Sequence, residues 1–332
     1  MRISNNMVET IITKFKSLFY KKNETKAMEI LKDKNKVSKL LEEAMNKAKA
    51  NRIGPIDEIW SKLQIVFSLL KDWISGEYKQ IPMGSLMILV VGLIYFITPI
   101  DILPDLIPGG FVDDVVIFGF LFKQISADID AYRSWKEEKA AITFYEKNGD
   151  AYADETLFID MSDVYERFEV YLNDGDTILD AGCGAGRDSK HFLEKGYDVT
   201  SFDGCKKLTQ RASSFIGKSV LNMKFTELNY NEDFNAIWAC SSLIHLTRKA
   251  FVKVLLKFYE ALKPEGHVYI SLKYGDSEKV EDGRVFASYT QSLVKDIIDT
   301  KTPFKIEEIW ITSDKRAGRE NEKWLNVILY KS

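Results

Sequence analysis

Cysteine is scarce in this chain, and neither sign of charge is in strong excess. The three cysteines, Cys183, Cys205 and Cys240, have neither the spacing of a disulfide framework nor that of a zinc site, so we expect a reducing compartment. The formal net charge of -3, and the lack of a basic groove with interleaved aromatic residues, give no reason to expect nucleic acid. Residues 1–20 lack the apolar core and cleavage site of a secretory signal, so we expect a cytoplasmic protein.

The chain has enough apolar material for two domains. Its 332 residues are 45% hydrophobic and 29% charged, which is typical of globular proteins. Residues 1–50 nevertheless carry 12 Lys and Arg against 6 Asp and Glu, a local excess of six positive charges. Apolar residues from Val8 to Phe19 recur at helical spacing beside several lysines. Such a basic amphipathic helix either lies on an anionic membrane or packs on its own protein with solvated lysines.

A long uncharged segment follows at residues 81–100. Twenty apolar residues could span a bilayer, but Pro82 and Pro99 trim the helix to about sixteen residues, which suits a buried helix. A second apolar run follows at residues 111–125, after a turn rich in Pro, Gly and Asp. We therefore expect an all-α N-terminal domain that contains an apolar helical hairpin. Three locations stay open: the cytoplasm, the inner face of the membrane, and insertion through residues 81–125.

Four acids surround the turn of this hairpin, namely Asp101, Asp105, Asp113 and Asp114. Grouped carboxylates can bind a hard cation, but Asp also caps helices and shapes turns, and we favour the second role and predict no metal site. Residues 20–137 resemble the YkvA-like domain family, whose function is not established. The resemblance rests on Gly76-Glu-Tyr, Tyr95-Phe-Ile-Thr-Pro-Ile-Asp-Ile-Leu-Pro-Asp105, Asp113-Asp114 and Trp135. We accordingly assign residues 1–137 to this domain.

Beyond the charged run at residues 136–139 the pattern changes to alternating strands and helices, which predicts a parallel α/β sheet over residues 138–332. Its central motif is Asp-Thr-Ile-Leu-Asp-Ala-Gly-Cys-Gly-Ala-Gly at residues 176–186. A buried strand here ends at Asp180 and breaks into Gly182, Gly184 and Gly186, which let the backbone approach a ligand at the start of a helix. The alternative is a Gly-rich turn without a ligand.

A second acid, Asp203, follows Asp180 by 23 residues and stands at the end of the next strand. Since the carboxyl ends of parallel strands share one crevice, the two acids can face one ligand. A carboxylate at this place can accept hydrogen bonds from both hydroxyls of a ribose. Taken alone, an Asp at a strand end is more often a cap.

Residues 141–332 resemble class I methyltransferases of the tellurite-resistance (TehB-like) group. Matching stretches are Leu179-Asp-Ala-Gly-Cys-Gly-Ala-Gly-Arg-Asp188, Gly196-Tyr-Asp-Val-Thr-Ser-Phe-Asp203, Ile237-Trp-Ala-Cys-Ser-Ser-Leu-Ile-His245, Leu262-Lys-Pro-Glu-Gly266 and Trp324-Leu-Asn326. The resemblance implies a Rossmann-like sheet of seven strands, in the order 3-2-1-4-5-7-6, with the last strand antiparallel. It also implies S-adenosylmethionine as cofactor, its methionine half at Asp180 and the three glycines, and its ribose at Asp203.

One departure from this family concerns adenine. The third strand of such enzymes often ends in an acid near the adenine amine, but residues 223–227, Met-Lys-Phe-Thr-Glu, offer no clear equivalent. The adenine contacts therefore stay unassigned.

Methyl transfer from a sulfonium needs alignment and exclusion of water, and it needs a general base only when the acceptor must lose a proton. His245, after the fourth strand, is the candidate base, and its alternative role is packing in the loop. Loop residues could form a lid or an anion-binding pocket: Lys273, Tyr274, Arg284, Tyr289, Arg316 and Arg319. We predict a methyltransferase that acts on a small or soluble acceptor. The alternative is a non-catalytic cofactor-binding module that docks on a membrane or partner through its N-terminal domain.

Overall fold

The computed structural model describes residues 5–50, 55–98 and 112–332, and it describes side chains for residues 8–50, 60–98 and 116–332. The chain divides into two compact units, Met1–Arg133 and Ser134–Ser332. Helices form the described part of the first unit, and the second is an α/β unit, as the sequence predicted. The division at residue 137 stays a prediction, and residues 136–139 lie inside helix α7 (Ser126–Thr156).

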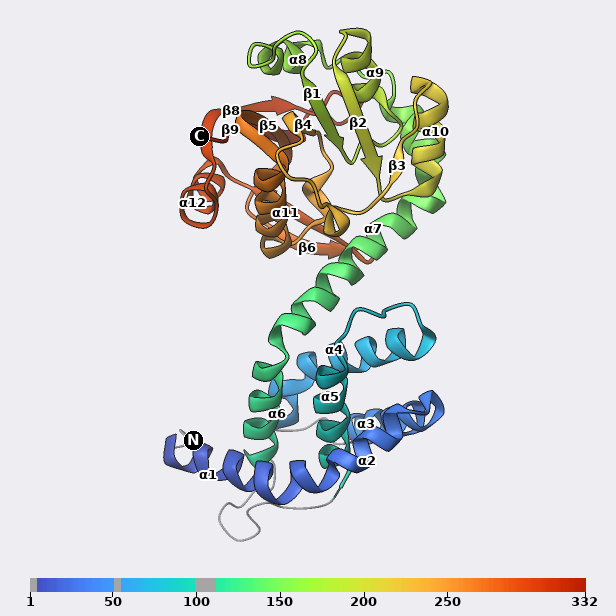
Figure 1. Ribbon diagram of the computed structural model, residues 1–332, viewed down its shortest axis with the longest axis vertical. Helices are drawn as coiled ribbons and strands as arrows, with labels where there is room; N and C mark the ends of the chain where they lie inside the picture. The colour runs from blue at the N-terminus through green and yellow to red at the C-terminus, as the bar shows by residue number, and fades with distance from the viewer. Residues whose placement is uncertain (1–4, 51–54, 99–111) are drawn as a thin grey trace. The chain divides into compact units, whose positions relative to one another are not determined.

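The N-terminal unit is built around α5 (Met83–Ile97), which packs against α2, α3 and α6 (Figure 1). It begins after Pro82 and ends before Thr98, whose extended backbone (φ -76°, ψ 128°) suits a residue that precedes proline. The other helices of this unit are α1 (Asn5–Lys14), the π-helical η1 (Phe15–Tyr20), α2 (Lys21–Leu31), α3 (Lys34–Ala50), α4 (Pro55–Ser75) and α6 (Val112–Gln124).

Helices α5 and α6 form the predicted apolar pair. They approach closely at Gly92, where an added Cβ would come within 2.9 Å of Leu121 Cδ1. The rings of Phe96 and Phe118 meet edge to face, with their centroids 5.6 Å apart. The four acids considered for a cation site lie outside the described side chains: Asp101, Asp105, Asp113 and Asp114.

The apolar face of the basic amphipathic helix packs on its own protein, as in the second of its two alternatives, and its lysine-bearing face is exposed. Ile11, Phe15 and Phe19 are buried, and the rings of Phe15 and Phe19 both contact Tyr95 of α5 edge to face. The neighbouring lysines are exposed. Among the helices that the structure describes, none is both long enough and apolar enough to cross a membrane.

The sheet of the C-terminal unit has the predicted strand order. Its strands are β1 (Thr177–Ala181), β2 (Asp198–Asp203), β3 (Leu221–Asn222), β4 (Phe234–Ala239), β5 (Leu262–Tyr274), β6 (Glu278–Glu281), β7 (Arg284–Tyr289), β8 (Lys305–Ser313) and β9 (Lys323–Tyr330). Strands β3-β2-β1-β4-β5 run parallel, and β9 lies antiparallel between β5 and β8. Without the β6–β7 hairpin this is the order 3-2-1-4-5-7-6, so the predicted Rossmann-like methyltransferase topology is confirmed.

The β6–β7 hairpin was not predicted. Its strands pair from Glu278↔Ala287 to Glu281↔Arg284, and β7 extends the sheet beside the end of β5. The two turn residues, Asp282 and Gly283, have φ of 49° and 77°. Such positive φ values at both central positions are typical of tight hairpins, and Asp-Gly is a preferred sequence for them. The signal was therefore present in the sequence.

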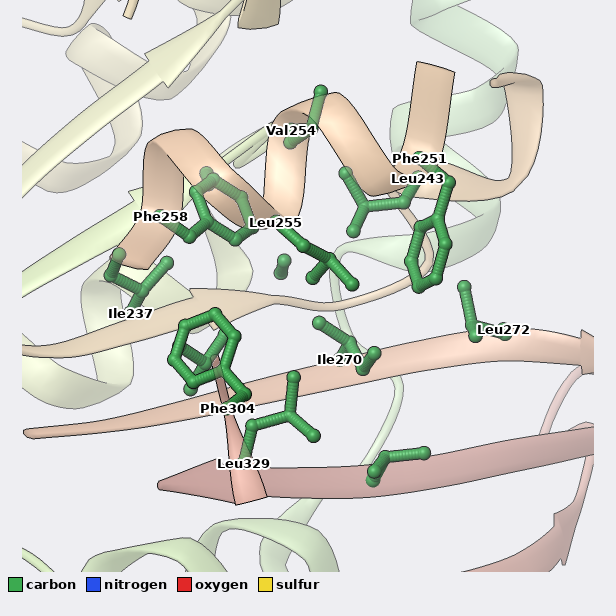
Figure 2. Close-up of a cluster of buried hydrophobic side chains, with 14 of the residues drawn as sticks. Ile237, Leu243, Phe251, Val254, Leu255, Phe258, Ile270, Leu272, Phe304 and Leu329 are labelled. Atoms are coloured by element: carbon green, nitrogen blue, oxygen red, sulfur yellow. The ribbon is translucent and has the colours of Figure 1, made fainter. Parts of the chain in front are cut away.

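Consecutive residues of each strand point to opposite faces of the sheet, and helices cover both faces. On one face Ile178, Trp238 and Tyr269 pack with α8 (Ser162–Glu169) and α9 (Arg187–Glu194). The other face packs with α11 (Arg248–Ala261) and α12 (Gln291–Lys301). Figure 2 shows Phe251, Leu255 and Phe258 of α11 over the strand residues Ile237, Ile270 and Leu329. A three-layer sandwich results, which leaves the strand ends available for a site.

Candidate functional site

Two adjoining cavities lie at the carboxyl ends of the parallel strands in the C-terminal unit. The larger has a volume of about 650 Å³ and the smaller about 90 Å³. Loops that follow β1 and β4 contribute to both walls, together with the later turns of α7. The residues common to both cavities are Tyr145, Tyr152, Gly182, Gly184, Cys240, Ser241 and His245. The two cavities therefore form one cleft.

The glycine-rich turn forms a wall made of backbone. Gly182, Gly184 and Gly186 have φ of 79°, 57° and 92°, a region that other residues rarely adopt. A Cβ on Gly182 would lie 2.5 Å from Cβ of Ser242, so the loops after β1 and β4 touch there. Gly182 and Gly184 line both cavities. Gly186 lines neither: it begins α9 and lies against Ala212 of α10 (Lys206–Ile216), where a Cβ would come within 3.2 Å of the Ala212 methyl.

Asp180 lies beneath this turn. It is 1% exposed, and its carboxylate accepts a hydrogen bond of 2.5 Å from the Ser189 hydroxyl of α9. Burial, and then the charge of Asp188, raise the pKa of Asp180 well above its usual value. The carboxyl lines neither cavity. Its described contacts are those of a group that fastens β1 to the start of α9.

Asp203, at the end of β2, lines the smaller cavity. Its two oxygens accept hydrogen bonds from the backbone N–H groups of Gly184 (3.1 Å) and Cys205 (2.8 Å). Burial raises the pKa of Asp203 to about 6, whereas these two hydrogen bonds lower it. The structure thus brings Asp203 to Gly184, whereas Asp180, the acid that the spacing paired with Asp203, lines neither cavity.

His245 also lines both cavities, and it lies in the short helix η3 (Leu243–His245) after β4. It is 7% exposed; its Nδ1 lies 2.9 Å from the backbone oxygen of Val285, and its Nε2 lies 3.1 Å from the Tyr145 hydroxyl. Since the carbonyl can only accept, we assign the proton to Nδ1, and Nε2 then accepts from Tyr145. Burial lowers the pKa of His245 to about 4, and the charges of Arg284 and Lys273 act in the same direction. The imidazole is therefore neutral at pH 7.

The larger cavity has a cationic wall. Among the loop residues singled out in the sequence, Lys273, Arg284, Arg316 and Arg319 line it, whereas Tyr274 and Tyr289 do not. Most basic side chains of this wall have acidic partners, and the pairs are Lys273–Glu322, Lys279–Glu281, Lys315–Asp163, Arg316–Asp314, Arg319–Glu322 and Arg187–Asp188.

Arg284 differs from these side chains. Its guanidinium lies over the Phe144 ring, 3.4 Å from the centroid, and 4.9 Å from that of Phe286. No carboxylate partner for it occurs in the part of the chain that the structure describes, and its Nε is buried without a hydrogen bond. It is thus a cation available to an anionic ligand.

Sequence reasoning missed a buried polar network under the cleft. Asp188 accepts from Arg187 Nε (2.6 Å), the Tyr165 hydroxyl (2.5 Å) and Trp238 Nε1 (2.8 Å). Burial opposes ionisation of Asp188, but the charge and hydrogen bonds of these partners hold its pKa below the usual value. Arg187 and Asp188 both line the larger cavity. A pattern of single residues could not have predicted this convergence of α8, α9 and β4.

The cysteines near the cleft are poor nucleophiles. Burial raises the pKa of the Cys240 thiol to about 11, and the charge of Asp188 adds to this effect. Burial also raises the pKa of Cys183. Both thiols are therefore protonated at pH 7. Among the described residues, no group of three or more His, Cys, Asp or Glu side chains is placed to hold a metal ion.

The fold and a family model agree on the class of the C-terminal unit. Residues 178–266 match the model described as "Methyltransferase domain". The 1,6-didemethyltoxoflavin-N1-methyltransferase of Burkholderia thailandensis is a similar solved structure, with a TM-score of 0.50 and 20% identity over 59% of this chain and 87% of that one. The unit therefore has the fold of S-adenosylmethionine-dependent methyltransferases, and the cofactor of this class is the one that the sequence predicted.

The N-terminal unit has a different relative. Residues 85–120 match the model described as "Protein of unknown function (DUF1232)". The protein named "Uncharacterized membrane protein YkvA" of Bacillus subtilis is 34% identical over 71 residues, which are 21% of this chain and 67% of that protein. Through this segment the chain belongs to the YkvA-like family.

The finer grouping of the methyltransferase stays a prediction. A TehB-like methyltransferase of Corynebacterium glutamicum has a TM-score of 0.43 and 17% identity, over 58% of this chain and 100% of that one. A likeness of this size does not distinguish one group of methyltransferases from another.

Proposed function

We propose that residues 134–332 bind S-adenosylmethionine in the cleft and transfer its methyl group to a small acceptor. One observation carries this proposal: the turn at Gly182 and Gly184, the Asp203 carboxylate and a neutral His245 all line a single cleft. The chemistry of these groups fits the cofactor. The turn offers a wall without side chains, and Asp203 offers a carboxylate to the ribose hydroxyls.

The bound cofactor supplies a methyl group activated by a sulfonium, so the protein needs no nucleophile of its own. The backbone at Gly182 and Gly184 would hold the methionine half. Tyr145 and Tyr152 of α7 line both cavities and would exclude water from the reacting atoms. Nε2 of His245 would accept a proton from an acceptor that must lose one, once the acceptor displaces the Tyr145 hydroxyl.

The position of Arg284 favours a methyl acceptor that carries an anionic group. It lies near His245, because β7 supplies both Arg284 and the Val285 carbonyl that holds the imidazole. The rings of Phe144 and Phe286 beside the guanidinium would accommodate a flat apolar part of the same molecule. A carboxylate or a phosphate would suit this cation.

The test has two parts and uses the full-length chain. Calorimetry should show S-adenosylhomocysteine binding in the micromolar range, roughly -8 kcal/mol. Cell extract, separated on an anion exchanger, should then incorporate label from methyl-labelled cofactor in the fractions that the exchanger retains. Absence of binding would refute the proposal. Binding without transfer to any fraction would instead favour the non-catalytic alternative, which the comparisons do not favour.

The N-terminal unit would dock the enzyme on an anionic membrane surface. Its Bacillus subtilis relative is named a membrane protein. Lys14, Lys21 and Lys22 are exposed, and each lies within four residues of Leu18, which is itself 66% exposed. Lysines around an exposed apolar side chain suit a surface of anionic lipids.

A further inference from the structure

The smaller cavity holds a buried acid that none of the sequence motifs included. Glu138, on α7, is 7% exposed and lines this cavity together with Asp203. Its Oε2 accepts a hydrogen bond of 2.9 Å from the Thr226 hydroxyl, in the short helix η2 (Phe225–Glu227). Its Oε1 is buried and has no partner among the described residues. Leaving such an oxygen unsatisfied costs free energy, so a ligand that donates to it would be stabilised.

The position of this cavity favours one part of the cofactor. It lies at the carboxyl ends of β2 and β3, beyond the carboxylate that would hold the ribose, so the base would follow there. Met223 and Phe225 line one side, and Leu208 and Ile142 also contribute apolar atoms. These side chains suit the flat faces of a purine, and Glu138 is the acid among them besides Asp203.

Lys224, two residues after β3, also lines this cavity, but an ammonium can only donate hydrogen bonds. The adenine amine likewise donates, so Lys224 cannot accept from it. Both oxygens of Asp203 accept from backbone N–H groups, and in the proposed function the ribose hydroxyls take their remaining capacity to accept. Among the acidic side chains that line this cavity, Glu138 Oε1 is therefore the acceptor left for an exocyclic amine.

We propose that Glu138 accepts a hydrogen bond from the exocyclic amine of the cofactor's adenine and thereby selects adenine over hypoxanthine. This inference rests on the proposed function. Hypoxanthine carries an oxygen in place of that amine, and an acceptor facing another acceptor repels it. Glu138, on the helix before the sheet, would thus replace the acid that often ends the third strand in related enzymes and for which residues 223–227 offer no clear equivalent.

The test compares S-adenosylhomocysteine with S-inosylhomocysteine by calorimetry on the full-length chain. The wild type should bind the adenosyl compound about 10- to 150-fold more tightly, the range expected for a hydrogen bond to a charged group. Glu138→Gln keeps the shape and offers an amide that can donate to the hypoxanthine oxygen. Its ratio of the two affinities should fall about tenfold or more. Glu137→Gln, which makes the same change of charge next door, should leave the ratio unchanged.

A ratio in Glu138→Gln equal to that of the wild type would overturn the inference. Failure of the wild type to bind S-adenosylhomocysteine at all would refute the proposed function instead. Thermal unfolding of each variant checks that it is folded.

Discussion

The two units differ in whether their buried polar groups have hydrogen-bond partners. In the N-terminal unit such groups pair with one another: Tyr132 donates to Asp72 (2.5 Å) and accepts from the Ser68 hydroxyl (2.8 Å), and Ser85 donates to Asp128 (2.5 Å). Within the described side chains of this unit, no buried polar atom lacks a partner. In the C-terminal unit several do, and Glu138, Ser242 and Arg284 among them line the cleft.

This difference separates a scaffold from a site. A closed hydrogen-bond network fixes the packing of helices and leaves nothing for a ligand to satisfy. Polar atoms that are buried but unpaired cost stability, and they persist where a ligand can compensate for them. We therefore expect changes in the N-terminal interior to affect stability, and changes around the cleft to affect binding and catalysis.

The largest expected effect concerns the cleft. His245→Ala should lower the rate of methyl transfer by about 10² to 10⁴, because the neutral Nε2 is lost as proton acceptor. Single-turnover assays with labelled cofactor measure this rate, and S-adenosylhomocysteine affinity should stay nearly constant. His191→Ala is the control, since His191 pairs with Glu169 and lines neither cavity.

If cofactor affinity or folding falls together with the rate, His245 has the packing role instead. An acceptor that is already a strong nucleophile would make the substitution almost silent. That result would remove the general base from the mechanism and leave alignment as the function of the cleft.

The next effect concerns the ribose. Asp203→Ala should weaken S-adenosylhomocysteine binding by about 1.5 to 3 kcal/mol, since a charged acceptor is lost. Calorimetry measures this change. Asp198→Ala, at the other end of β2 and paired with Lys218, is the matched control and should bind as the wild type does. An affinity of Asp203→Ala equal to that of the wild type would exclude Asp203 from the site.

A smaller effect concerns the surface of the N-terminal unit. Because the described buried polar groups of this unit are paired with one another, we expect a function of this unit to lie on its surface. Replacing Lys21 and Lys22 by Ala should weaken binding to phosphatidylserine vesicles by about 2 kcal/mol, roughly 1 kcal/mol for each lysine. Flotation at low salt measures this loss. Removing the exposed Lys295 and Lys301 of α12 gives the same change of net charge and should have little effect. A wild type that does not float with these vesicles would disprove the docking proposal.

The smallest expected effect concerns the hydrogen bonds among the buried polar groups of the N-terminal unit. Tyr132→Phe removes the hydroxyl that donates to Asp72 and accepts from Ser68, and it should cost about 1 kcal/mol of unfolding free energy. Urea denaturation measures this loss, while S-adenosylhomocysteine affinity should not change. A change of affinity would mean that the two interiors are not functionally distinct.

The sequence predicted what short segments determine. A buried strand, an acid and three glycines within eleven residues identified the turn at Gly182, and the strand order followed from the family that these residues resemble. The spacing of two acids also predicted that Asp203 would reach the crevice beside this turn, and Asp203 does line the smaller cavity. These features depend on neighbours in the chain, so a pattern can capture them.

What the sequence did not predict depends on convergence of distant elements. Glu138 and Tyr145 each precede the first strand by more than thirty residues, so no local spacing connects them with Asp203 or His245. Asp180 and Gly186 are parts of the recognised motif, yet packing gives them places behind the wall of the cleft. The β6–β7 hairpin is the exception, because its Asp282-Gly283 turn was visible and was not used.

Helix α7 has a consequence for how such a gene could be assembled or divided. Recombination that joined two coding segments at residue 138 would start the second product inside a helix, with Glu138 in its first turn. The first four N–H groups of a helix have no partner within it, and such ends fray. The acid of the smaller cavity would then sit on the least ordered turn. A methyltransferase unit that folds by itself should therefore include the whole of this helix. Its first residue should lie before Ser126, where the helix starts.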